Sequence, residues 1–239
     1  GMSYKSMIAN FDRIIDRFQA IPVAGEPKVR VGVVGEIYVK YSPLGNNNLE
    51  QFLLSEGAEP VVPGLTDFVI FKIYNRDVDV DIYGGRWIKQ KFCQIFASYI
   101  KKYQRAMIDA LNRSGRFRAP GDFDELHHYI KGYLGDGNKM GEGWLLTAEM
   151  LELIHTGVPN IVCTQPFGCL PNHIVGKGMI RKLKDDYPNS NIVAIDYDPG
   201  ATKINQENRI KLMLANARAL AKGEGSAAPA PAEQAPAAV

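Results

Sequence analysis

A short run of β-branched residues near the N-terminus most strongly limits how this chain can fold. The segment Val29–Gly35 (Val-Arg-Val-Gly-Val-Val-Gly) is apolar at nearly every position, which is typical of a strand covered on both faces. Residues 160–163 and 191–195 have the same character, and 59–63 predicts a further short strand. Helix-favouring segments separate these runs. We therefore expect an α/β fold with a parallel sheet, either flavodoxin-like or Rossmann-like.

The rest of the length divides into a leading segment, an insertion and a tail. Residues 1–28 hold an amphipathic helix and a lead-in, and Gly1 before Met2 is typical of a residue left by tag removal. The α/β domain is expected to span 29–222. Residues 223–239 are mostly Ala and Pro with almost no large apolar side chain, which predicts a disordered tail.

A helical insertion is expected at about 67–157, between the second and third strands. Its apolar residues recur every three or four positions, which predicts one amphipathic helical stripe. That stripe comprises Ile88, Phe92, Ile95, Tyr99, Tyr103, Met107 and Leu111. Further helices are predicted at about 122–133 and 142–156. The sheet and a helical insertion lobe together account for the length.

The composition argues against several classes of partner. The 28 Lys and Arg side chains nearly balance the 26 Asp and Glu, which leaves a formal net charge of +2. Nucleic-acid binders usually have a basic excess gathered on one face, so no nucleic acid is expected. No apolar run is long enough for a membrane helix, so we expect no membrane association and a cytoplasmic location. Three cysteines are too few for a secreted disulfide framework.

Polar loops follow three of the predicted strands, where an open parallel sheet binds its ligands. After the first strand come Glu36 and Tyr38, and then three consecutive asparagines, Asn46, Asn47 and Asn48, that precede a helix. Side chains of this kind can bind a ligand. They serve equally well as caps and turns, because Asn oxygens accept hydrogen bonds from helix N-terminal amides.

Two thiols follow the third strand. Cys163 and Cys169 are separated by five residues of a Pro- and Gly-bent loop, so both sulfurs could face one pocket. Thiolates favour soft transition metals and iron–sulfur clusters, while buried thiols without a metal are an equally good interpretation. Gln165, Asn172 and His173 accompany them, and His173 is either a functional group or part of a helix cap.

The fourth strand is followed by Asp196 and Asp198 and then by a helix. On that helix Asn205 and Arg209 are four residues apart and share one face near the strand ends. Asp198-Pro199 is equally typical of a helix cap. The third cysteine, Cys93, lies in the long amphipathic helix and is expected to be a packing residue. The Gly-rich segment 135–143 lacks the Gly-Lys-Ser/Thr end of a P-loop, so no ATPase site is expected.

These segments resemble the 2-hydroxyacyl-CoA dehydratase family, in particular the C-terminal region of large activase-related proteins. The resemblance covers nearly all of residues 29–214, and the cysteine segment is its most specific part. The motifs that carry it are Gly35-Glu36-Ile37-Tyr38-Val39-Lys40 through Asn46-Asn47-Asn48, Gly141-Glu142-Gly143-Trp144, Cys163-Thr164-Gln165-Pro166-Phe167-Gly168-Cys169-Leu170-Pro171-Asn172-His173-Ile174, and Ile195-Asp196-Tyr197-Asp198-Pro199-Gly200 through Asn205-Gln206 to Asn208-Arg209-Ile210.

The resemblance implies a flavodoxin-like domain with a four-iron four-sulfur cluster, an acyl-CoA substrate, and an ATP-dependent activase partner that delivers one electron. It implies Cys163 and Cys169 as cluster ligands, with a third ligand outside this chain. Glu36, Tyr38 and His173 are implied near the reacting group, within a pocket formed by Asn46, Asn47, Asn48, Gln165, Asn172, Asp196, Asp198, Asn205 and Arg209.

This chain has one such α/β domain where dehydratase subunits have two, and it lacks the activase signatures. We therefore expect a domain that accepts electrons and is inactive alone, completed by missing N-terminal domains or by a partner subunit. It would belong to a dehydratase (lyase) or an ATP-dependent reductase system. The alternative is a non-catalytic docking or regulatory module in which both cysteines are structural.

Overall fold

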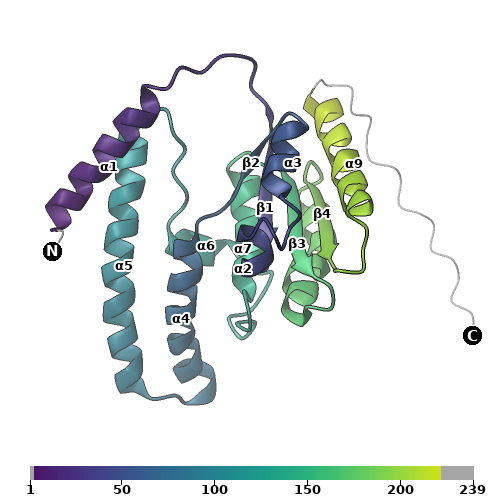
Figure 1. Ribbon diagram of the computed structural model, residues 1–239. Coiled ribbons are helices and arrows are strands. Elements are labelled where there is room, and N and C mark those ends of the chain that lie inside the picture. The colour runs from purple at the N-terminus through teal and green to yellow at the C-terminus, as the bar shows by residue number, and fades with distance from the viewer. Residues whose placement is uncertain (1–2, 222–239) are drawn as a thin grey trace, which may run out of the picture.

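The computed structural model describes residues 3–221 and has a four-stranded sheet at its centre (Figure 1). Its strands are β1 (Val29–Gly35), β2 (Ala58–Val61), β3 (Asn160–Pro166) and β4 (Asn191–Tyr197). They are all parallel, in the spatial order β2-β1-β3-β4. The expected α/β fold with a parallel sheet is confirmed. The predicted tail and the tag residue Gly1 lie outside the described residues.

Nine α-helices accompany the sheet in the described part of the chain. They are α1 (Tyr4–Gln19), α2 (Ile37–Tyr41), α3 (Leu49–Ser55), α4 (Leu65–Tyr83), α5 (Trp87–Ser114), α6 (Phe123–Tyr129), α7 (Trp144–His155), α8 (Ile180–Asp186) and α9 (Lys203–Ala221). A π-helical turn, η1 (Asn172–Gly176), and a 3-10 turn, η2 (Lys177–Met179), precede α8. None of these helices is both long and apolar enough to cross a membrane.

The two faces of the sheet bury alternate residues of each strand. Val31 and Val33 of β1 lie in one core with apolar residues of α3 and α9. Val34 points to the opposite face, where it packs with residues of α7 and α8. Because both faces are covered, the strands are apolar at nearly every position, as the sequence pattern predicted.

The insertion contains helices of two kinds. Helices α4 and α5 form a hairpin beside the sheet, and α1 lies along part of α5 (Figure 1). Helix α7, by contrast, packs directly on β1 and β3 and belongs to the sheet layers. The predicted helical lobe is therefore smaller than the inserted segment. Helices α2 and α4 were not predicted, and α4 buries the polar residues Asp67 and Asn75, which obscure its apolar stripe.

Candidate functional site

The strand order reverses direction between β1 and β3. The chain moves from β1 outward to β2, and from β3 outward to β4 on the other side. The carboxyl ends of β1 and β3 therefore flank a topological switch point, which is where open α/β sheets bind their ligands. The ends of these two strands approach closely here, since Glu36 N donates to the carbonyl oxygen of Thr164 at 3.0 Å. A Cβ on Gly35, which has φ +143°, would lie 1.8 Å from that oxygen.

Glu142 joins the two loops at this switch point. It precedes α7 and is buried, and one carboxylate oxygen accepts a hydrogen bond from Ile37 N at 3.2 Å. Its other oxygen accepts from Asn172 Nδ2 at 2.9 Å. One side chain thus fixes the start of α2 to the start of η1. Sequence reasoning placed Glu142 in a recognised motif but not among the site residues.

Cys169 is the thiol that lies at this edge of the sheet. It is half-buried in the loop after β3, and Asn172 Nδ2 donates to its Sγ at 3.2 Å. A cysteine sulfur at such an edge is a group that can bind a metal or attack an electrophile. The neighbouring turn η1 is π-helical, and such turns are frequent at functional sites.

His173 and Asp196 extend the site toward β4. His173 Nδ1 donates to the carbonyl oxygen of Cys169 at 2.8 Å, so a neutral ring has its lone pair at Nε2. That Nε2 lies 3.7 Å from Asp196 Oδ1, too far for a direct hydrogen bond. Gln165 Nε2 donates to Asp196, and Lys177 Nζ lies 3.4 Å from its other oxygen. Burial opposes ionisation of Asp196, but Gln165 and Lys177 together lower its pKa below the ordinary value.

Two buried amide oxygens at this edge have no hydrogen-bond partner. Asn172 Oδ1 and Gln165 Oε1 belong to side chains that are completely buried, and neither accepts a hydrogen bond. A buried, unpaired acceptor is costly, by about 1–3 kcal/mol.

Cys163 lies in the apolar core, away from the sheet edge that holds Cys169. Strand β3 continues to Pro166, so Cys163 is mid-strand and fully buried among apolar residues of α7 and η1. Burial raises the pKa of its thiol to about 12, which keeps it protonated. A Cβ on Gly176 would lie 3.2 Å from its Sγ, so the cavity around the sulfur is tightly closed. Cys163 is therefore a core residue, and its sulfur does not face a common pocket with that of Cys169.

The three asparagines after β1 differ in their burial and in their hydrogen bonds. Asn46 is buried, donates to the carbonyl oxygens of Val39 and Lys40, and accepts from Leu49 N at 3.1 Å. It caps α3 and ties that helix to α2. Asn47 and Asn48 are exposed, with φ values of +55° and +58°, and Asn47 Nδ2 donates to Gln206 Oε1 at 2.8 Å. The capping interpretation therefore accounts for Asn46.

The residues after β4 also differ in their roles. Asp198 accepts a hydrogen bond from Gly200 N at 2.9 Å, and it therefore stabilises the turn that follows β4. Asn205 and Arg209 are exposed on α9. The buried residue of that helix turn is Gln206, which donates to the carbonyl oxygen of Asp196 at 3.0 Å and was not predicted.

Glu36 and Tyr38 lie on either side of the start of α2. Glu36 caps this helix, since its carboxylate accepts from Val39 N at 2.8 Å. The side chain of Tyr38 is exposed beside the loop. Both are at the switch point, but neither contacts Cys169 through a hydrogen bond among the described residues.

Exposed apolar side chains occur in several of the loops that form this edge. They come from α2 and its following loop, from the Gly-rich loop before α7, and from the loop after β3. These residues, here called the apolar rim, are Tyr38, Leu44, Met140, Phe167, Leu170 and Ile174. Exposed apolar residues that gather on loops around a polar centre are typical of a surface that a second protein domain covers.

A buried ion pair joins α2 to α7. Lys40 Nζ is 2.7 Å from Glu149 Oε1, and both side chains are almost completely buried. Burial raises the pKa of Glu149, and the adjacent ammonium opposes this shift. Nearby, burial raises the pKa of Asp67 to about 6 and that of Glu152 to about 7.

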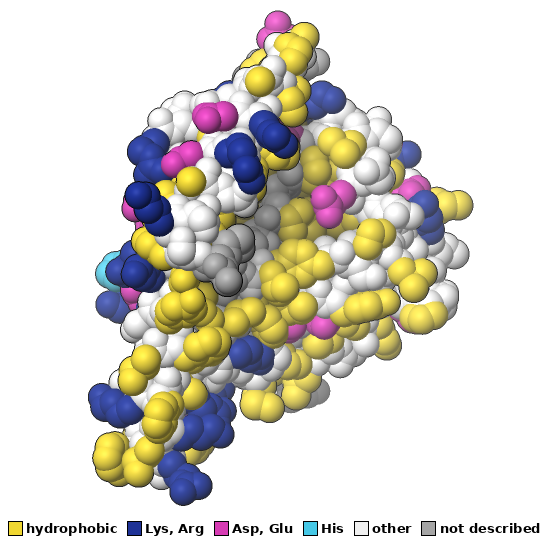
Figure 2. All heavy atoms as spheres, turned by 60° about the vertical axis from the view of Figure 1, so that its left-hand side comes forward, with side chains coloured by type: hydrophobic (Ala, Val, Ile, Leu, Met, Phe, Trp, Pro, Cys, Tyr) yellow, Lys and Arg dark blue, Asp and Glu magenta, His cyan; other side chains and the backbone are white. Residues whose placement is uncertain are grey.

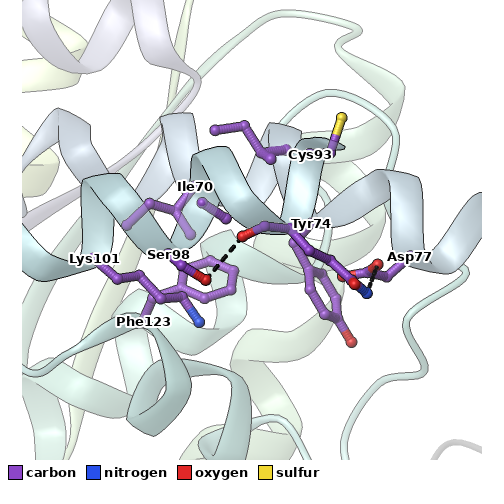
Figure 3. A pocket seen from close by; sticks show the side chains of 10 residues that line it. Ile70, Tyr74, Asp77, Cys93, Ser98, Lys101 and Phe123 are labelled. Carbon is purple, nitrogen blue, oxygen red and sulfur yellow. Dashed lines mark hydrogen bonds between the residues drawn. The ribbon is translucent and has the colours of Figure 1, made fainter. Parts of the chain in front are cut away.

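The remaining cysteine, Cys93, lines a small cavity of about 130 Å³ between α4 and α5 (Figure 3). Ile70, Tyr74 and Phe123 also line it, and Gln94 Nε2 donates to Asp77 at 2.8 Å on its wall. None of the predicted site residues lines this cavity. Cys93 is half-buried there.

A complete cluster site is not present in the described part of the chain. Over residues 3–221, no group of three or more His, Cys, Asp and Glu side chains is placed to hold a metal ion. The half-buried Cys169 lies where it could serve as a ligand, whereas Cys163 is enclosed in the apolar core. No family model, curated protein or solved structure matches this chain.

Proposed function

We propose that the carboxyl edge of this sheet is one half of a composite iron–sulfur site, to which the domain contributes Cys169. The observation that supports this most strongly is the position of its Sγ. The thiol lies beside the switch point and accepts a hydrogen bond from Asn172, which Glu142 holds in place. The remaining ligands would come from a second domain or a partner subunit.

The surroundings of Cys169 agree with a shared site. The apolar rim offers a surface for the second domain. Asp196 and Lys177 supply one charge of each sign close to His173. A bound cluster would supply one-electron chemistry. The residues of this chain would hold it, exclude water and place charges nearby.

A non-catalytic docking module is the second candidate. The burial of Cys163 in the apolar core favours it, because that thiol has a structural role. The two proposals share the apolar rim and differ in Cys169, which is a ligand in the first and only a loop residue in the second.

Anaerobic reconstitution tests the first proposal. The chain is incubated with iron and sulfide in the presence of glutathione, whose thiolates can supply the missing ligands. We expect iron and sulfide to be retained by the unmodified chain and by Cys93→Ser, and to be lost in Cys169→Ser. Retention of equal iron by Cys169→Ser would leave the docking module as the better account.

A further inference from the structure

Helix α5 has one apolar stripe, and half of it is exposed. In its first four turns Ile88, Phe92, Ile95 and Tyr99 each have more than half of their surface exposed. Trp87 and Phe96, at 65% and 55% exposed, widen the same region. Figure 2 shows apolar side chains along the projecting hairpin, with Lys and Arg side chains beside them. The exposed stripe is defined here as residues 87–99.

The second half of the same stripe is covered by α1. The rings of Tyr4 and Tyr103 meet edge to face at 5.3 Å, and Asp12 pairs with Arg113 at 2.7 Å, so the two helices run in parallel. Coverage stops at the first turn of α1. The ring of Tyr99 lies 4.8 Å from that of Tyr103, which makes the covered and exposed parts continuous. An amphipathic helix is thus the structure that this stripe already accepts.

Along α5 itself the charge beside the exposed stripe has one sign, although Asp77 of α4 accepts a hydrogen bond from Gln94 at 2.8 Å. Residues 84–108 contain no Asp or Glu, and Arg86, Lys89 and Lys91 form no ion pair with any described residue. Arg86 and Lys89 also border a groove of about 440 Å³, which Ile88, Phe92 and Phe96 line. A partner that buries these apolar side chains and neutralises these cations must itself be apolar with acidic borders.

We propose that the exposed stripe of α5 binds an amphipathic helix of a partner protein whose apolar face is bordered by Asp or Glu. This helix would continue the line of α1 along α5. A second copy of the chain is disfavoured, because two such faces would bring unpaired cations together. The proposal uses none of the residues at the sheet edge and stands independently of the iron–sulfur proposal.

Trp87 offers a direct readout of this interaction. The chain has two tryptophans, and the other, Trp144, is completely buried in an aromatic cluster. The probe is a synthetic helix of about five turns with a Leu face bordered by Glu, and its control replaces every Glu with Lys. We expect the Glu peptide to shift Trp87 emission to the blue and to reduce its quenching by acrylamide, and the Lys peptide to do neither.

Three variants test separately the apolar side chains, the cations and a control surface on α9. Phe92→Ser/Phe96→Ser should abolish the response, and Lys89→Glu/Lys91→Glu should weaken binding of the Glu peptide by about tenfold while allowing the Lys peptide to bind. Leu212→Ser removes an equally exposed apolar side chain from α9 and should leave the response unchanged. These side chains are on the surface, so the variants should fold.

Several results would overturn the proposal. One is an equal response to both peptides, and another is no response to the Glu peptide up to about 1 mM. A blue shift with phosphatidylglycerol vesicles but not with the peptide would indicate a lipid surface instead. Sedimentation of the chain as a dimer that Phe92→Ser/Phe96→Ser disrupts would indicate a second copy.

Discussion

The carboxylate of Glu142 accepts a hydrogen bond of 2.9 Å from the side-chain amide of Asn172, thirty residues further along the chain. The same amide nitrogen donates to Cys169 Sγ, so a residue just before α7 helps to fix where the thiol of the β3 loop lies. The other carboxylate oxygen accepts from Ile37 N. Three segments that are distant in sequence thus meet at the point where the strand order reverses.

Removing this carboxylate should loosen the site more than the fold. Glu142→Ala leaves Ile37 N without an acceptor and leaves the Asn172 amide with Cys169 Sγ alone, and we expect a loss of about 1–3 kcal/mol in the free energy of unfolding. The rate of Cys169 alkylation should also change, because Asn172 is no longer held. Urea unfolding and timed alkylation measure both. An unchanged alkylation rate in Glu142→Ala would show that Asn172 is held by other contacts.

The two cysteines of the β3 segment should differ in reactivity and in their effect on stability. Cys163 is buried and protonated, so iodoacetamide should not modify it in the folded chain, while the half-buried Cys169 should react. Cys163→Ser places a hydroxyl in an apolar core and should cost about 1–3 kcal/mol. Cys169→Ser should be nearly neutral. Peptide mass spectrometry and urea unfolding check these outcomes, and rapid native alkylation of Cys163 would contradict its placement.

The buried ion pair gives a stability prediction. Lys40→Met leaves Glu149 without its cation in a closed site, and we expect a loss of about 3–5 kcal/mol. The double variant Lys40→Met/Glu149→Leu removes both charges and should recover more than half of that loss. Urea unfolding of the two variants at pH 7 provides the comparison. A double variant no more stable than Lys40→Met would mean that packing, rather than charge, dominates the cost.

Glu152 should make stability depend on pH. Burial raises its pKa to about 7 in the folded chain from an ordinary value of 4.5, so the folded state binds more protons than the unfolded state between these values. Its contribution is therefore fully present below about pH 4.5 and is lost as the pH rises to about 7, with a slope of at most ~1.4 kcal/mol per pH unit.

Glu152→Gln isolates this contribution, because the amide oxygen can still accept from Gly121 N. Relative to the unmodified chain, the variant should gain stability as the pH rises from 4.5 to 7. Urea unfolding of both proteins at several pH values measures the difference. A difference that is constant across this range would show that Glu152 does not titrate as its burial requires.

The sequence was sufficient for the sheet but less so for the site. β-branched runs mark β1, β3 and β4 because a strand buried on both faces must be apolar throughout. The pattern ended β3 too early, because Thr164 and Gln165 are polar although both are buried. That shift of three residues moved Cys163 from the mouth of the sheet into its core. Side-chain alternation along the extended strand points Cys163 to the same face as Ile161.

Long-range contacts explain the other differences. Glu142 and Gln206 become site residues only through partners that are 30 and 10 positions away, which local spacing cannot show. Asn46 matches a cap because capping is local, and that interpretation could be made from the sequence. The exposed half of the α5 stripe has the same apolar spacing as the covered half, so periodicity alone does not tell them apart.

Alkylation of Cys169 before and after anaerobic reconstitution tests the central claim most directly. Timed iodoacetamide labelling and peptide mass spectrometry of one sample report all three thiols, with Cys93 as the internal control. A thiolate bound to iron cannot be alkylated, so we predict that Cys169 becomes protected in the iron-loaded chain while Cys93 reacts at its former rate. Labelling of Cys169 at an unchanged rate in a chain that retains iron would contradict its role as a ligand.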